Sequence, residues 1–359
     1  KPAYSLTGEA AERAIDAGLD RIRWYRTDVD KKALKQIMER KDGPAIRDTA
    51  IWFLALGGSG LGAIEFWGTF WCVPFFFIYG VMYGSAGDSR WHECGHGTAF
   101  KTIWMNKTVY HIACFMMMRN PVVWRWSHTR HHADTIVVGR DPEIALLRPA
   151  DLMRIGLNFF GMIDTFNGIK DMCRIAVSGL NVSEKTYVPK GHGKIAITTA
   201  RIWIVIYLIT LYGCYETGSI LPLMLIGLPR IYGAWHHVLT GLLQHGGLAE
   251  NVTDHRANTR TVIMNPISRF IYCNMNYHIE HHMFAAVPCY NLKKLQKETA
   301  THMPVPRSLI GAWKEMRMTW KKQQSEPDFQ FDTPVPGSGD IDQSSKGDPL
   351  ESSLGEINY

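Results

Sequence analysis

Four apolar stretches alternate with polar segments along the chain. They cover residues 49–64, 68–87, 197–214 and 219–240 and carry few charged side chains. A helix of about 20 residues, rising about 1.5 Å per residue, crosses a hydrocarbon core of about 30 Å. The stretches therefore predict two transmembrane helical hairpins, although the first stretch is short. Arg230, inside the fourth, is expected to extend its guanidinium toward the lipid headgroups.

Basic residues predict how these hairpins are oriented. The short turns at residues 65–69 and 212–219 contain no Lys or Arg, whereas the other polar segments contain several. The positive-inside rule then places both termini and the polar segments in the cytoplasm. The first 48 residues are charged and lack the apolar core of a secretory signal. We expect a multi-pass integral protein, typically of a bacterial inner membrane.

The polar segments divide the chain into three parts. Residues 1–48 are expected to form cytoplasmic or interfacial helices, one of them capped by Asp30. Residues 49–322 hold the four apolar stretches and a helical cytoplasmic cap. Residues 323–359 are rich in acidic side chains and poor in apolar ones, which predicts a disordered tail. The fold class expected is an all-α integral membrane protein.

Three histidine clusters lie in the polar segments. Their members are His92 and His96; His128, His131 and His132; and His278, His281 and His282. On a helix, residues three and four positions apart share a face, so each cluster can direct its imidazoles to one place. One cluster alone is often a solvated or structural feature, but three beside apolar spans are costly to bury without a ligand. Eight imidazoles exceed the needs of one tetrahedral ion and predict two metals.

No electron carrier is visible in the sequence. The seven cysteines are scattered without C-x-x-C spacing, which disfavours disulfides and iron–sulfur clusters, and no dinucleotide-binding glycine motif follows a strand. We therefore expect electrons to come from a separate ferredoxin or cytochrome-type protein that docks on the basic cytoplasmic face. Membrane lipid is the other expected partner, and nucleic acid is not expected.

The clusters and hairpins together resemble the membrane fatty acid desaturase and hydroxylase superfamily over residues 49–305. Its pattern is H-x(3,4)-H after the first hairpin, H-x(2,3)-H-H downstream and H-x(2)-H-H after the second, all present in order. The resemblance implies two irons held by histidine, dioxygen as co-substrate and oxidation of an unactivated C–H bond. It also implies His245 as a ninth ligand. Residues 242–262 are similar to a bacterial branch that includes rhizopine-type oxygenases, which act on small polar molecules.

Several functions stay open at this point. Desaturation of a fatty acyl chain is the leading hypothesis, and hydroxylation of a lipid or a small polar compound by the same centre is the alternative. A zinc-dependent membrane hydrolase would leave most of the histidines unused, and a metal transporter would need ionisable groups inside the spans. Ligating histidines usually donate their second N–H to a carboxylate or carbonyl, and Asp254 and Glu280 are the acids that we expect to accept it.

Overall fold

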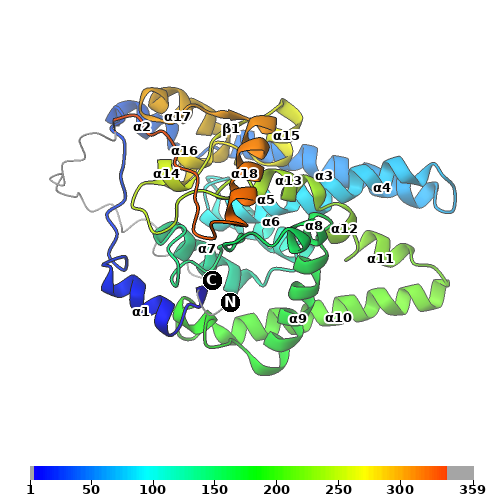
Figure 1. Cartoon of the computed structure of the whole chain (residues 1–359). Helices are drawn as coiled ribbons and strands as arrows, with labels where there is room; N and C mark the ends of the chain where they lie inside the picture. Colours follow the sequence, from blue (N-terminus) through cyan, green and yellow to red (C-terminus); the bar gives the residue numbers. More distant parts are fainter. Residues whose placement is uncertain (1–3, 338–359) are drawn as a thin grey trace.

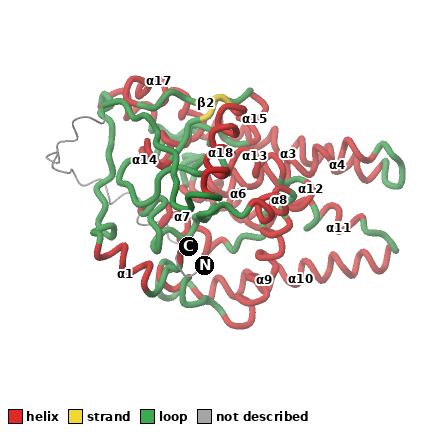
Figure 2. Tube along the Cα trace, in the orientation of Figure 1, coloured by secondary structure: helices red, strands yellow, loops and turns green. Residues whose placement is uncertain are grey.

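The computed structural model describes residues 4–337, and this part of the chain is almost entirely helical (Figures 1 and 2). Its only strands are β1 (Val262–Ile263) and β2 (Arg307–Ser308), which pair in parallel. Two helical arms extend from the body on the same side in Figure 1. One consists of α3 and α4, and the other of α10 and α11. The all-α architecture is therefore as predicted.

Helices of very different lengths succeed one another along the chain. In the first half of the described chain they are α1 Glu9–Asp16, α2 Lys31–Ile37, α3 Asp42–Glu65, α4 Cys72–Gly80, the π-helix η2 Val81–Ser85, α5 Ala86–His96, α6 Ile103–Met116, α7 Pro121–Ala133, α8 Leu152–Phe159 and α9 Met162–Ser178. The others are the 3-10 helix η3 Glu184–Thr186, α10 Gly193–Thr217, α11 Leu221–Leu225, α12 Pro229–Tyr232, α13 Trp235–Gly241, α14 His255–Asn258, α15 Pro266–Ile271, α16 His278–Met283, the 3-10 helix η4 Cys289–Asn291, α17 Leu292–Thr299, the 3-10 helix η5 Ala300–His302 and α18 Leu309–Gln323.

Two apolar cores stabilise the body. One is formed by side chains of α3, α5, α6, α7, α9 and α10, with Trp52 and Trp91 among its buried members. The other packs α16, α17 and α18 together around Ile279, Leu292 and Met316. Since α5 and α7 belong to the first core and α16 to the second, the three histidine clusters lie where the two cores meet.

The second apolar stretch forms one continuous rod. Helix α4 passes through the π-helix η2 directly into α5, which ends in a left-handed turn at Gly97. Trp52 of α3 donates from Nε1 to the carbonyl of Met82 inside the π-helix, at 2.8 Å. The wider π turn leaves carbonyl groups available to such donors. The rod therefore carries the chain from the tip of the first arm to the first histidine cluster.

The fourth apolar stretch is not one helix, which differs from the prediction. It is divided into α11, α12 and α13, with Gly227 at φ +102° and Pro229 at the start of α12. Glycine permits this positive φ, and proline cannot continue the helix before it. Arg230, just after the break, is 1% exposed and faces the interior rather than the headgroups.

One helix of the second arm has the length and composition of a membrane span. Helix α10 is the one helix within residues 4–337 that is long and apolar enough to cross a bilayer by length and composition. Large apolar side chains are nevertheless exposed near the ends of both arms, including Phe70 (83%), Trp71 (68%) and Tyr215 (82%). The four crossings and their cytoplasmic orientation stay predictions.

Both ends of the described chain pack on the body. Asp30 caps α2 by accepting from the amide of Ala33, as the sequence predicts. Residues 323–337 belong to the tail that the sequence predicts to be disordered, but here they contact the body. The amide of Phe331 donates to the carbonyl of Gly247 at 2.8 Å, and the carbonyl of Pro336 accepts from Arg256 at 3.1 Å. Residues 338–359, the rest of that tail, lie outside the described residues.

The backbone of the fourth apolar stretch packs closely against the rod formed by α4, η2 and α5. This close packing gives a first prediction. A Cβ on Gly233 would lie 1.8 Å from the carbonyl oxygen of Gly80, so backbone would have to move. We expect Gly233→Ala to lower the free energy of unfolding by about 1–3 kcal/mol, the usual cost of overpacking. Thermal unfolding of the purified protein measures this change. Gly213→Ala is the matched control, because its Cβ would meet Pro222 at an ordinary 3.7 Å; equal Tm values for the two variants would contradict the prediction.

Candidate metal centre

All nine histidines predicted as ligands come together between the two cores. They form two groups. Within each group, every histidine offers one ring nitrogen, and these nitrogens all lie within 4.8 Å of one another. The five-histidine group is His92, His96, His128, His132 and His281. The four-histidine group is His131, His245, His278 and His282. Each group contains histidines from segments that are far apart in the sequence. The clusters on α7 and α16 each contribute histidines to both groups.

Local structure explains how each cluster is presented. Helix α7 begins at Pro121, where the Asn120 side chain accepts from the amides of Val122 and Val123. Proline at the first helical position and asparagine at the N-cap are both favourable there. The helix then brings His128, His131 and His132 to the centre together. His245 lies just after α13, in a segment that follows the break in the fourth stretch.

Nitrogen distances in the five-histidine group fit shared coordination of one ion. His92 Nε2 lies 2.9 Å from His281 Nε2, and His128 Nε2 lies 3.1 Å from His96 Nε2 and 3.2 Å from His132 Nε2. Two nitrogens each about 2.1 Å from an ion and at right angles to each other would be about 3.0 Å apart. His128 donates from Nδ1 to Glu143 at 2.9 Å, so its Nε2 presents a lone pair to these neighbours.

The four-histidine group shows the same orientation. His131 Nδ1 bonds Asp141 at 2.8 Å, His245 Nδ1 bonds the carbonyl of Asn258 at 2.9 Å, and His282 Nδ1 bonds Thr135 Oγ1 at 3.1 Å. Within residues 4–337, His245 Nε2 is buried without any hydrogen-bond partner. A buried imidazole lone pair without a partner is costly unless it binds something. This set of donors fits a metal pair.

Burial keeps most of these imidazoles neutral. Burial first, and nearby positive charge second, lower the pKa of His96 and His245 to about 3. The pKa values of His92, His128 and His282 are also lowered, by burial first and by neighbouring imidazoles second. Neutral imidazole is the form that binds metals. His131 differs: burial opposes its charge, but the Asp141 carboxylate outweighs burial and raises its pKa.

The carboxylates that contact the ligands belong to the loop after α7. Asp141 Oδ2 accepts from His131 and from the amide of Ile136, while Oδ1 accepts from the amide of Glu143. Glu143 accepts from His128 and from Ser127 Oγ at 2.8 Å, and burial raises its pKa to about 7. The sequence favoured Asp254 and Glu280 for this role and singled out neither Asp141 nor Glu143. Their position ten to fifteen residues beyond the ligands, in Asp141-Pro142-Glu143, was the available signal.

The two acids predicted for this role have other partners. Asp254 caps α14 and pairs with Arg256 at 2.8 Å. Glu280 is buried on α16 and accepts from Thr261 Oγ1. Among the described residues, no hydrogen bond joins either acid to a cluster histidine. Glu280 lies between ligands in the sequence, but it is on a different face of the helix from His278 and His281.

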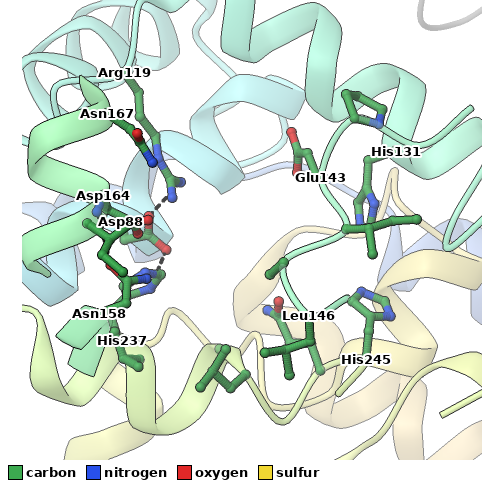
Figure 3. A pocket seen from close by; sticks show the side chains of 18 of the residues that line it. Asp88, Arg119, His131, Glu143, Leu146, Asn158, Asp164, Asn167, His237 and His245 are labelled. Atoms are coloured by element: carbon green, nitrogen blue, oxygen red, sulfur yellow. Dashed lines mark hydrogen bonds and ion pairs between the residues drawn. The ribbon is translucent and has the colours of Figure 1, made fainter. Parts of the chain in front are cut away.

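A cavity of about 630 Å³ lies against the centre. His92, His128, His131, His245 and His278 form part of its lining. Figure 3 shows His131 and His245 on one side, with Leu146 near them, and polar side chains across the space. Trp91 and Trp124 also line it, and the guanidinium of Arg119 lies over both rings, at 4.7 and 4.1 Å. The size suits a small organic molecule.

Comparison with known proteins identifies the family. A sequence model described as "Fatty acid desaturase" matches residues 69–307, which include every histidine of the centre. The chain belongs to the fatty acid desaturase family. Family membership indicates an oxidoreductase. The resemblance inferred from the histidine spacing is thereby confirmed.

Three relatives show how distant the likeness is. The chain is similar to an endoplasmic reticulum omega-3 fatty acid desaturase of Nicotiana tabacum, with 23% identity over 246 residues, covering 61% of this chain and 64% of the relative. A chloroplastic omega-3 fatty acid desaturase of Ricinus communis is 23% identical over 257 residues, covering 62% and 54%. A probable fatty acid desaturase of Sorghum bicolor is 22% identical over 314 residues, covering 75% of each chain. The first two are matched over less than two thirds of their own length.

The contact between His131 and Asp141 gives the second prediction. In Asp141→Asn the carboxylate is lost, and the amide cannot both stabilise the imidazole and keep the two backbone contacts. We expect metal affinity to fall about 10- to 100-fold, as is usual for such outer contacts. Competition with a metal indicator measures this affinity. Asp30→Asn is the control, because asparagine caps a helix as well as aspartate does; equal losses in both variants would contradict a specific role for Asp141.

Proposed function

We propose that this chain is a membrane-associated oxidoreductase that uses two irons and dioxygen to oxidise an unactivated C–H bond. The observation that carries the proposal is the pair of histidine groups, five and four strong, beside one cavity. Neutral imidazole is a good ligand for iron, and the family match supports oxidation. Two metals require two such groups, and both are present.

Some residues of the site would hold the metals, and others would hold the substrate. Bound irons would supply activation of dioxygen and abstraction of a hydrogen atom from carbon. The nine histidines would hold them, and Asp141 and Glu143 keep His131 and His128 in the orientation that presents Nε2. The cavity places a substrate C–H bond next to the histidines, while Trp91 and Trp124 limit the access of water there.

Two reactions are consistent with this arrangement. Desaturation of an acyl chain is favoured by the names of the relatives, which are fatty acid desaturases. Hydroxylation is the second candidate, and the polar side chains on one side of the cavity, including Asp88, Arg119 and Asp164, favour it. Identity near 22% leaves the choice of substrate to the residues of this chain.

Zinc-dependent hydrolysis is less consistent with the site. A hydrolytic zinc usually has three protein ligands and a water, whereas the two groups offer five and four imidazoles. Hydrolysis is therefore not needed to account for the histidines.

Electrons would come from a separate ferredoxin or cytochrome-type protein. In support, no cysteine within residues 4–337 joins either potential metal-binding group. The chain carries a formal net charge of +6, which suits an acidic donor. The two arms would enter the membrane, supported by the exposed apolar side chains at their ends and by the apolar length of α10. The centre would then face the cytoplasm.

Removal of one ligand from each group tests the centre. We expect His131→Ala and His281→Ala each to lower bound iron from two per chain toward one and to reduce turnover at least 100-fold, because each removes a ligand from a different group. Elemental analysis and product formation with a ferredoxin and its reductase measure these effects. His302→Ala, on the exposed 3-10 helix η5, is the control. Full iron content and activity in either cluster variant would exclude that histidine as a ligand.

Oxygen labelling tests the reaction. With ¹⁸O₂, a hydroxylated product should contain the label, because oxygen is transferred to carbon, whereas a desaturated product should contain an alkene and no label. Mass spectrometry of lipids and small metabolites from cells with and without the protein separates the two outcomes. Product formation that continues without dioxygen would contradict both reactions.

A further inference from the structure

The side of the cavity opposite the histidines is a wall of polar side chains. Figure 3 shows this polar wall across the space from His131 and His245, made of Asp88, Arg119, Asn158, Asp164, Asn167 and His237. These residues come from α5, α8, α9, α13 and the turn after α6. The wall is therefore built from several elements, of which only α5 also carries histidines of the two groups.

Asp88 organises one half of the polar wall. It accepts from Trp91 Nε1 at 2.9 Å, forms an ion pair with Arg119 at 2.7 Å and lies 2.8 Å from His237 Nδ1. Side chains of this trio are only 12–15% exposed. Their mutual contacts hold them in place before any molecule enters the cavity, which lowers the entropic cost of binding.

Helix α9 supplies the other half. Asp164 and Asn167 are three residues apart and therefore share one face of the helix. Asp164 pairs with the buried Arg230 of α12 at 3.2 Å, yet its own side chain is 34% exposed. A carboxylate has about four acceptor sites, so Asp164 retains capacity toward the cavity. Asn167 is half-buried and offers both a donor and an acceptor.

The charges of the two ion pairs balance. The carboxylates of Asp88 and Asp164 offset the guanidinium groups of Arg119 and Arg230. A charged ligand at the polar wall would meet a like charge as well as an opposite one. An acyl chain against the same wall would remove water from these groups without replacing its hydrogen bonds. A hydroxyl group both donates and accepts, which matches a mixed and neutral surface.

We propose that the cavity binds an uncharged, hydroxyl-rich substrate. Its hydroxyl groups contact Asp164, Asn167 and Arg119 while the carbon to be oxidised lies beside the histidines. This inference rests on the proposed function for the oxidation step, but it assigns a different substrate class from the one in the relatives' names. A free polyol and the hydroxylated head of a lipid share this chemistry.

Binding measurements test the substrate class. The intact, iron-loaded chain is placed in phosphatidylcholine nanodiscs, so that no sugar-headed detergent competes, and is titrated with sorbitol, octyl glucoside, hexanoate and palmitate. Tryptophan fluorescence reports binding, because Trp91, Trp124 and Trp203 line the cavity. We expect sorbitol or octyl glucoside to bind at least ten-fold more tightly than both acids. The tighter of the two identifies a free polyol or a lipid-borne head.

Variants connect binding to the polar wall. Asn167→Leu should weaken binding of the hydroxylated probe at least ten-fold, because an apolar side chain replaces both the donor and the acceptor. Asp164→Asn should weaken it as well, and Asn167→Leu alone suffices if loss of the Arg230 pair prevents folding. Arg317→Gln, on the exposed side of α18, is the matched control and should bind as the unmodified protein does.

Two outcomes overturn the proposal. One is tighter binding of palmitate than of either hydroxylated probe. The other is that neither hydroxylated probe binds the unmodified protein, or that its binding is unchanged in Asn167→Leu. Neither outcome affects the proposed function if the chain still holds two irons and oxidises the acid. Conversely, a chain that binds sorbitol but holds no iron and consumes no dioxygen would contradict the proposed function and leave the substrate class standing.

Discussion

The rest of the structure depends on buried imidazole nitrogens that face one another. Neighbouring Nε2 atoms lie 2.9 to 3.2 Å apart, and burial lowers the pKa of nearly all the rings. Protonation would place positive charges side by side, and neutral rings leave lone pairs opposed. Cations bound between the rings would relieve both problems at once. The body can therefore be understood as the scaffold that brings four short segments together at the two histidine groups.

Hydrogen bonds outside the histidine groups hold those segments in position relative to one another. Arg90 and Ser89 on α5 both donate to the carbonyl of Ile271, each at 2.6 Å, and Glu93 accepts from the amide of Cys289 at 3.0 Å. These bonds tie α5 to the chain on both sides of α16. Burial raises the pKa of Glu93 to about 7, so this link is made by a carboxyl that is easily protonated. The first and third clusters are thus linked by these bonds as well as by the contact between His92 and His281.

Some of this arrangement follows from the sequence and some does not. Histidine spacing on helices is a local property, so the eight cluster residues could be predicted as ligands, and the family resemblance added His245. The supporting acids could not be predicted in the same way, since Asp141 and Glu143 reach the rings through a loop whose path depends on tertiary packing. Asp254 is close to a cluster in sequence but is held by the neighbouring Arg256. The fourth apolar stretch has the same composition whether it is straight or broken, and hydropathy alone therefore does not reveal the break at Pro229.

That break has a chemical consequence at the cavity. A continuous helix would have carried Arg230 to the membrane surface or left it against lipid, where an isolated guanidinium is costly. Instead α12 turns inward, and Gly80 and Gly233 let it approach the rod closely enough for Arg230 to meet Asp164. The pair fixes the position of Asp164 on α9, which presents its remaining acceptor capacity to the cavity. Helix α5 carries both Asp88 of the polar wall and two histidines of the centre, but α8, α9 and the turn after α6 belong to the wall and not to the centre. Most of the polar wall can therefore change while the histidine centre stays the same.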